Sequence, residues 1–572
     1  MFFALRGRRL RGVARMTALR KSESSREVIR TIDRIEILSD KSFMDLSLLR
    51  GPWPLAAWAI LTESIRVVET SVPAELYASR NHINAATNMS MLAALFYRFA
   101  RRYGMRGPFD ASKFIWSSRL AEDLRLAMEL SKGYQTFCTV FPYWHQDMYA
   151  GELVNNSVVR FVSSESLTGR RINAYRQGIR PRDISEPTST AIQTTPELRR
   201  LFDRSLNGAI KVSQHGVVFP DLRELQEALY ELQDQRTSAM ARRYQETQIG
   251  DYKLSEFRRF YSAINAVAAT HEFLCYLWSQ AHGLPIDSLL LYAHRSQWAD
   301  DLSRLAKLPR AQVYAMIQDA SFGRVYAADF HLLPFVPLTE RGTVLALAPF
   351  CSLSSNWEEN VLRCLSRRDS DLYSSNNLTK EEEMRRPLVA LTSGVRLMSG
   401  PHKLTKPTPD IDLLVQDLSA NILIICELKW SRKPNGYKER RDRDAEVLKG
   451  FSQIEKIRHF IDANPEYLYK RGYTAWELSK FKSIHYCVVA RDHIVESPAR
   501  AIPIYGYDEF VSQLRETADT ARFLKFMKDL EWLPREGSDF GVRFERHCVG
   551  RVAVESEIYY PALGPSAVYR RA

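Results

Sequence analysis

The sequence predicts an α+β multidomain protein, with a large, mainly α-helical amino-terminal region followed by a carboxy-terminal three-layer domain of αβββαβ order. Two observations carry this prediction. From about residue 25 to residue 330, apolar side chains recur every three or four positions, as in Trp58, Leu61, Ile65 and Val68. After residue 377, apolar runs of strand length alternate with helical patterns, which is typical of a mixed sheet covered by helices.

Changes in composition along the 572 residues set the predicted boundaries, because one hydrophobic core does not organise a chain of this length. We expect a basic, disordered leader over 1–24, a helical region over 25–365 with a β-hairpin near 335–348, the three-layer domain over 378–516, and an extension over 517–572. The polar stretch 165–196 contains Gly169, Gly178, Pro181 and Pro187, so it is predicted to be an excursion between helical subdomains.

Net charge is uneven along the chain. Lys and Arg exceed Asp and Glu by 80 to 67, and residues 1–30, with nine basic and two acidic side chains, contribute +7 of the resulting +13. A transit peptide, a disordered basic arm and a true start at Met16 rather than Met1 are all open interpretations of this leader. The basic excess is therefore weak evidence for a polyanionic partner.

Composition also bears on the cellular environment. No run approaches the roughly 18 apolar residues that span a bilayer, so a membrane protein is not expected. The seven cysteines are odd in number, scattered, and form no C-x-x-C pair. This pattern is typical of reduced thiols in a cytoplasmic protein.

The predicted elements of the three-layer domain follow in order after residue 377. We expect a helix over 378–392, strands over 395–398, 410–415 and 422–430, a basic loop over 431–443, a second helix through residues 447–461, strands over 484–490 and 502–505, and a short helix over 508–514.

Charged side chains occupy every second position at the ends of two of these strands. Asp410 and Asp412 project to one face of the first, and Glu427 and Lys429 to one face of the second, because strand side chains alternate. The run 422–426 is apolar on both faces, which indicates a central strand. If the two strands are neighbours, the carboxylates form an oxygen-rich site for a hard cation, most naturally Mg²⁺, which would support phosphodiester hydrolysis.

At these residues the sequence resembles the PD-(D/E)XK nuclease superfamily, whose members have the restriction-endonuclease-like fold. The resemblance rests on Pro409-Asp410, the strand that begins at Asp412, the Glu427-Leu428-Lys429 triplet, and Gln453 in the following helix. It implies that Asp412 and Glu427 bind the metal, that Lys429 supports the water nucleophile, and that Gln453 borders the site. Asp410 fits the written motif literally, so the choice between Asp410 and Asp412 as principal ligand stays open.

Some members of that superfamily add a glutamate from the first helix to the metal site. Glu381, Glu382 and Glu383 are the candidates here. Glu381 is favoured because it lies on the same helical stripe as Met384 and Leu388.

Basic side chains follow the Glu-x-Lys triplet closely. Residues 430–443 carry a local charge of +4, and we expect phosphate contacts from Arg432, Lys433, Lys438, Arg440, Arg441 and Arg443. A solvated, basic helix start is the competing interpretation.

The predicted function is a metal-dependent (endo)nuclease that uses Mg²⁺, or Mn²⁺ as an alternative, to hydrolyse nucleic acid, DNA rather than RNA. A protein partner or homo-oligomer is expected to use the helical region. By association only, such an arrangement fits bacterial antiviral defence, mobile-element processing or repair. The alternative is a catalytically inactive nuclease fold that serves as a nucleic-acid-binding or protein-interaction module.

Overall fold

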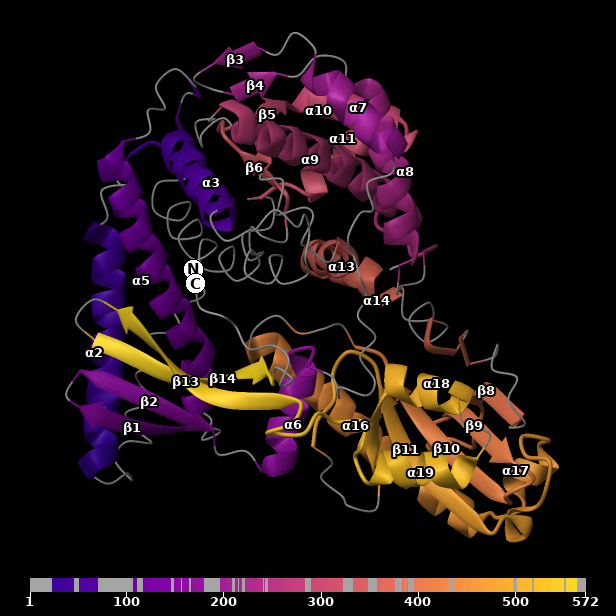
Figure 1. The fold of residues 1–572 in the computed structure, drawn as a ribbon. Coiled ribbons are helices and arrows are strands. Elements are labelled where there is room, and N and C mark those ends of the chain that lie inside the picture. Colours follow the sequence, from indigo (N-terminus) through magenta and orange to yellow (C-terminus); the bar gives the residue numbers. More distant parts are fainter. Residues whose placement is uncertain are drawn as a thin grey trace.

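A computed structural model gives the fold (Figure 1). It describes residues 23–45, 51–69, 106–107, 109–110, 117–145, 149–155, 157–163, 166–179, 196–207, 211–213, 216–218, 222–239, 241, 245–282, 290–322, 333–347, 357–375, 383–385, 387–388, 396–431, 434, 437–496, 502–516, 519–549 and 552–562. Residues 1–22 of the predicted leader lie outside these ranges, and Glu23 already begins a helix. None of the helices within the described ranges is long and apolar enough to cross a bilayer.

The first hydrophobic core is built mainly of helices, as the sequence predicts. Its helices are α3 (Trp53–Glu69), the first half of α5 (Ser118–His145), α7 (Pro196–Leu206), α8 (Arg223–Ala239), α9 (Leu254–His282), α10 (Arg295–Ala306), α11 (Arg310–Asp319) and α13 (Trp357–Arg368), followed by α14 (Ser370–Ser375). The predicted hairpin is confirmed: β6 (Phe335–Pro337) and β7 (Val344–Leu347) pair antiparallel. β5 (Leu291–His294) adds a third strand, and β3 (Lys211–Ser213) pairs with β4 (Gly216–Val218).

A four-stranded sheet joins two distant parts of the chain. Its order is β1 (Tyr149–Asn155), β2 (Val158–Ser163), β14 (Val552–Pro561) and β13 (Phe540–Val549), with β14 parallel to β2. Helices α2 (Glu23–Asp45) and α5 (Ser118–His145) share a core with this sheet. The strands expected near 541–544 and 551–554 are confirmed, whereas β1 and β2 occur where the sequence indicated mainly helix. β1 and β2 form a local hairpin, but the second partner of β2, β14, lies almost 400 residues later, so a local sequence pattern misses that pairing.

The second large core surrounds a five-stranded sheet of order β12-β11-β10-β9-β8. Its strands are β8 (Arg396–His402), β9 (Ile411–Asp417), β10 (Ile422–Lys429), β11 (Ser483–Ala490) and β12 (Ile504–Gly506). The pairs β8–β9 and β9–β10 are antiparallel, and β10–β11 and β11–β12 are parallel. All five strands coincide with predicted segments, so a mixed sheet is confirmed.

Helices cover both faces of this sheet. α16 (Tyr437–Ala463) connects β10 to β11 and packs on one face, where Gly450 lies against the side chains of Lys429 and Val488. On the other face lie α18 (Tyr507–Glu516) and α19 (Thr520–Lys528), since Phe510 of α18 stacks on Tyr505 and meets Phe523 of α19 edge-on. The short helices α17 (Tyr467–Lys470) and η5 (Leu478–Lys480) lie between α16 and β11.

The predicted helix over 378–392 falls only partly on described residues. Residues 383–385 and 387–388 are helical, and Met384 and Leu388 are buried in the second core. Leu378 and Leu391, the other two members of the predicted stripe, lie outside the described ranges.

The second core also recruits segments from both sides of the predicted boundaries. Residues 167–176, expected to be part of an irregular excursion, form helix α6 (Leu167–Arg176), capped by the side chain of Ser166. Tyr175 of α6 packs edge-on against Trp532, with ring centroids 5.2 Å apart, and both belong to this core. The five-stranded unit therefore extends past residue 516 and includes a helix from the amino-terminal half.

Candidate active site

Asp412 and Glu427 lie across from each other on neighbouring strands. The antiparallel register of β9 and β10 pairs Leu413 with Cys426. Continuing it by one residue sets Asp412 opposite Glu427, and residues directly opposite in such a pair point to the same face. The apolar strand β10 is buried along almost its whole length. Two carboxylates thus meet at the edge of the sheet where β10 ends.

The two candidate aspartates have different surroundings. Oδ2 of Asp412 accepts a hydrogen bond from the backbone N–H of Leu428 (2.8 Å), and its Oδ1 lies 3.6 Å from Nη2 of Arg385. Asp410 is exposed just before β9, and its Oδ1 accepts the backbone N–H of Leu404 (3.1 Å). Asp412 therefore contacts the strand that carries Glu427 and Lys429, whereas Asp410 stabilises the preceding loop.

Glu427 and Lys429 form a close ion pair on the face covered by α16. Nζ of Lys429 is 2.5 Å from Oε1 of Glu427, and the Glu427 side chain is only 3% exposed. A glycine at position 450 leaves room for the lysine, because a Cβ there would lie 2.9 Å from Cε of Lys429. Helix packing thus fixes where the ammonium group sits.

The first helix contributes Glu383 to the same end of the sheet. Its Oε1 is 2.6 Å from Nη1 of Arg491 and accepts a hydrogen bond from Nε1 of Trp430 (3.2 Å). Glu381, the candidate favoured from the sequence, and Glu382 lie outside the described residues.

Arg385 and Arg491 border the site although the sequence analysis did not select them. Arg491 directly follows β11, its backbone N–H donates to the carbonyl of Lys429 (2.9 Å), and its guanidinium stacks over the Tyr507 ring (5.3 Å). The carboxyl ends of parallel strands meet at one edge of a sheet. Parallel pairing of β10 and β11 would have indicated Arg491, but that pairing cannot be read from one sequence.

Gln453 lies one turn after Gly450 on α16. Residues three apart on a helix share a face, and helical side chains lean toward the amino terminus. Its Oε1 atom is buried and has no hydrogen-bond partner within the described part of the chain. This leaves an acceptor on the helix face that covers Lys429.

The basic segment after the Glu-x-Lys triplet is partly helical, because α16 begins at Tyr437. Arg440 is engaged inside the protein: it donates to Oδ1 of Asn173 (2.7 Å) and Oη of Tyr143 (3.1 Å). Arg443 pairs with Glu446, and exposed Arg441 lies 3.6 Å from Asp442. Arg432, Lys433 and the side chain of Lys438 lie outside the described residues.

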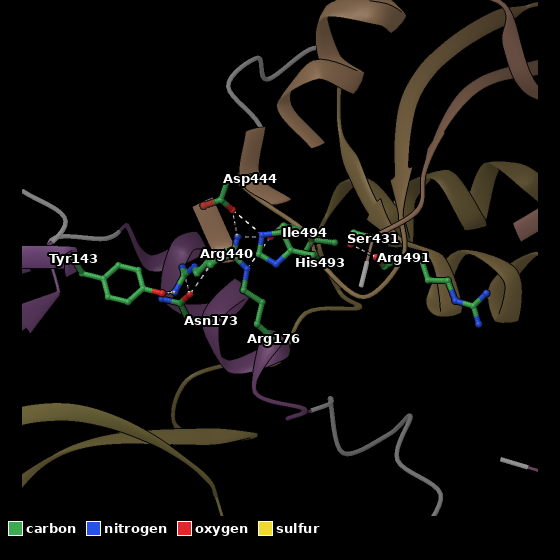
Figure 2. A network of polar contacts seen from close by, with 9 residues as sticks. All are labelled: Tyr143, Asn173, Arg176, Ser431, Arg440, Asp444, Arg491, His493 and Ile494. Carbon is green, nitrogen blue, oxygen red and sulfur yellow. Dashed lines mark hydrogen bonds and ion pairs between the residues drawn. The ribbon is translucent and has the colours of Figure 1, made fainter. Parts of the chain in front are cut away.

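A polar network ties α6 to the start of α16 and to the segment after β11 (Figure 2). Arg176 donates through Nε to the carbonyl of Ile494 (2.8 Å), and its Nη2 lies 3.3 Å from Oδ1 of Asp444. His493 donates through Nε2 to the same carboxylate oxygen (2.7 Å). Figure 2 also shows Ser431 bound to the carbonyl of Arg491. The network thus reaches the residues beside the candidate site.

Burial and the pairing between His493 and Asp444 set the ionisation of this network. It lowers the pKa of His493 to about 4, although the hydrogen bond to Asp444 opposes the shift, and Arg176 and Arg440 lower it further. For Asp444, burial favours a higher pKa, but the His493 hydrogen bond and the charge of Arg176 outweigh it and lower the pKa. At neutral pH the network therefore contains a neutral histidine and an ionised aspartate.

Acidification is expected to destabilise the fold through His493. In the unfolded chain this histidine has a pKa near 6.5, whereas in the folded protein its pKa is about 4. Between these two pH values the unfolded state therefore binds a proton that the folded state does not bind. The contribution of His493 to the free energy of unfolding, on the order of 3 kcal/mol, is fully present above pH 6.5 and is lost as the pH falls toward 4. Urea midpoints measured from pH 7 to pH 4.5 should fall less steeply in His493→Gln. The matched control is exposed His459→Gln, and equal slopes in wild type and His493→Gln would contradict the prediction.

The donor set at the site fits a hard divalent cation held by few protein ligands. Mg²⁺ commonly keeps several waters and binds one or two carboxylates, and Asp412 and Glu427 offer two on one face. Buried Oε1 of Gln453 is a further polar atom on the covering helix. Across the described ranges, no group of three or more His, Cys, Asp or Glu side chains could hold a metal ion. The arrangement is therefore a two-carboxylate site with cationic side chains around it.

Comparison with known proteins adds no family assignment: no family model, curated protein or solved structure matches the chain.

Proposed function

We propose that the five-stranded unit is a metal-dependent nuclease of the PD-(D/E)XK type that hydrolyses phosphodiester bonds, with DNA as the favoured substrate. One observation carries the proposal: the register of β9 and β10, continued by one residue, sets Asp412 opposite Glu427 on one face of the sheet, and Nζ of Lys429 lies 2.5 Å from Glu427. The order of three antiparallel strands, a crossover helix and a parallel strand supports a restriction-endonuclease-like fold.

Each side chain has a separate task in the proposed reaction. Asp412 and Glu427 would hold Mg²⁺, which when bound supplies charge neutralisation and lowers the pKa of a coordinated water. Lys429 holds a positive charge beside Glu427, where it can orient the attacking water and stabilise negative charge that develops on the phosphate. Gly450 leaves room for the methylene chain of Lys429, so the ammonium position depends on helix packing.

A cleavage assay with a matched pair of variants tests this function. Purified wild-type protein is incubated with plasmid, linear duplex, single-stranded DNA and RNA, with Mg²⁺, Mn²⁺ or EDTA. Asp412→Asn keeps an oxygen that can accept the Leu428 N–H but removes the ligand charge, so cleavage should be lost. Asp529→Asn, at an exposed position of the same unit, is the control and should cleave normally. If no substrate is cut in any metal, the nuclease proposal fails.

An inactive module remains a second candidate because both proposed metal ligands are already paired with cations. Arg385 lies against Asp412 and Lys429 against Glu427. Such pairing would suit a fold that holds nucleic acid without cutting it. Binding of labelled DNA that is unaffected by metal, in a protein that cuts nothing, would support this second function.

A further inference from the structure

Three carboxylates at the carboxyl end of β10, all of low exposure, are each paired with a cation. The pairs are Asp412 with Arg385 (3.6 Å), Glu427 with Lys429 (2.5 Å) and Glu383 with Arg491 (2.6 Å). All six side chains are less than one-fifth exposed. Their formal charges cancel within this cluster. A divalent cation placed on Asp412 and Glu427 would therefore add two uncompensated positive charges in a poorly solvated place.

The pair formed by Asp412 and Arg385 is the one most easily opened. Its 3.6 Å separation is longer than a hydrogen bond. Arg491, by contrast, is also anchored through its backbone N–H and by the ring of Tyr507. Oδ2 of Asp412 accepts a hydrogen bond from the backbone N–H of Leu428, and Oδ1 is the oxygen that lies nearer to the guanidinium of Arg385. A metal bound through Oδ1 would compete with the guanidinium for the same oxygen.

We propose that Arg385 is an internal counter-ion of Asp412, which a divalent cation displaces and which then binds a phosphate of the substrate. The inference rests on the proposed nuclease function. A planar guanidinium fork matches two phosphate oxygens, and a cation released from its carboxylate needs a new anion. Metal and nucleic acid would thus bind synergistically, because the phosphates compensate the charge that the metal introduces. By linkage, each ligand tightens the other by the same factor.

Metal binding without nucleic acid tests the counter-ion role directly. Titration calorimetry of the full chain with Mg²⁺, and electron paramagnetic resonance of Mn²⁺, should give about tenfold tighter binding for Arg385→Gln than for wild type, since one nearby like charge is removed. Arg396→Gln, at an exposed position of β8, is the matched control and should bind metal as wild type does. Equal metal affinity in wild type and Arg385→Gln would overturn the counter-ion role and leave the nuclease proposal intact. Failure of both to bind any metal would remove the nuclease proposal and this inference together.

Phosphate binding is tested by fluorescence anisotropy of a labelled DNA duplex in Ca²⁺ and in EDTA. We expect Ca²⁺ to tighten DNA binding by wild type, and to tighten it far less for Arg385→Gln. Arg385→Lys keeps the charge but loses the planar fork, so its metal affinity should stay near wild type while its DNA affinity falls. If Arg385→Gln does not fold, the wild-type protein alone tests the synergy. A DNA affinity that is the same in Ca²⁺ and in EDTA would contradict it.

Discussion

Replacing Lys429 by methionine is expected to lower the rate of metal-dependent cleavage by at least about 10²-fold, the usual effect of removing one group that stabilises transition-state charge. The methylene chain remains beside Gly450, so packing changes little. What disappears is the positive charge 2.5 Å from Glu427. Single-turnover rates at saturating Mg²⁺ measure the effect on the chemical step.

Two further variants separate this catalytic effect from a loss of folding. Lys429→Arg keeps the charge beside Glu427 but changes the donor geometry, so its rate should fall between wild type and Lys429→Met. Exposed Lys480 precedes β11, at the opposite edge of the sheet from the site, and Lys480→Met should leave the rate unchanged. A Lys429→Met protein that cuts at the wild-type rate would exclude the lysine from the reaction.

Replacing Arg491 by methionine is expected to destabilise the five-stranded unit by about 3–5 kcal/mol, because it leaves the Glu383 carboxylate buried without its cation. The Glu383 side chain is only 7% exposed, so water cannot take over the role of the guanidinium. Loss of the stacking contact with Tyr507 adds to the effect. Urea unfolding followed by tryptophan fluorescence measures the change.

Removing the second charge should reverse most of that loss. In Arg491→Met combined with Glu383→Gln, no carboxylate is left buried alone, so the free energy of unfolding should recover toward the wild-type value. Lys470→Met, which breaks the exposed pair with Glu466, is the matched control and should leave the urea midpoint almost unchanged. If Arg491→Met alone behaved like Lys470→Met, the buried pair would contribute nothing to stability.

Elements with a strong local pattern could be predicted, whereas pairings between segments far apart in the sequence could not. The apolar strand β10 and its Glu427-x-Lys429 end coincide with the predicted segment, since hydrophobic runs and alternation act locally. Strands β1 and β2 form a local hairpin within a region that the sequence indicated to be helical, and the parallel partner of β2, β14, lies nearly 400 residues later, where a local pattern does not reveal it. Helix α6 was missed because Tyr175 is held by Trp532 and the second core, not by a repeated apolar spacing of its own.

The candidate site shows the same division. Asp412, Glu427 and Lys429 could be selected from the sequence because strand alternation places acids and a lysine on one face. Arg385 and Arg491 could not, because single arginines near strand or helix ends carry no pattern. Arg440 was expected to contact phosphate, but in the structure it donates to Asn173 and Tyr143, a use that only the position of α5 and α6 reveals.

The sequence by itself determined the five strands of the second core, helices α16 and α18, and the acidic and basic side chains at the end of β10, because hydrophobic periodicity and side-chain alternation are local properties of the chain. The tertiary structure decided what surrounds those side chains. It set Arg385 against Asp412 and Arg491 against Glu383, and it brought α6 from the amino-terminal half onto the segment after β11. Ion pairs between remote residues depend on burial and on which segments the packed cores bring together, and neither is written in a local pattern.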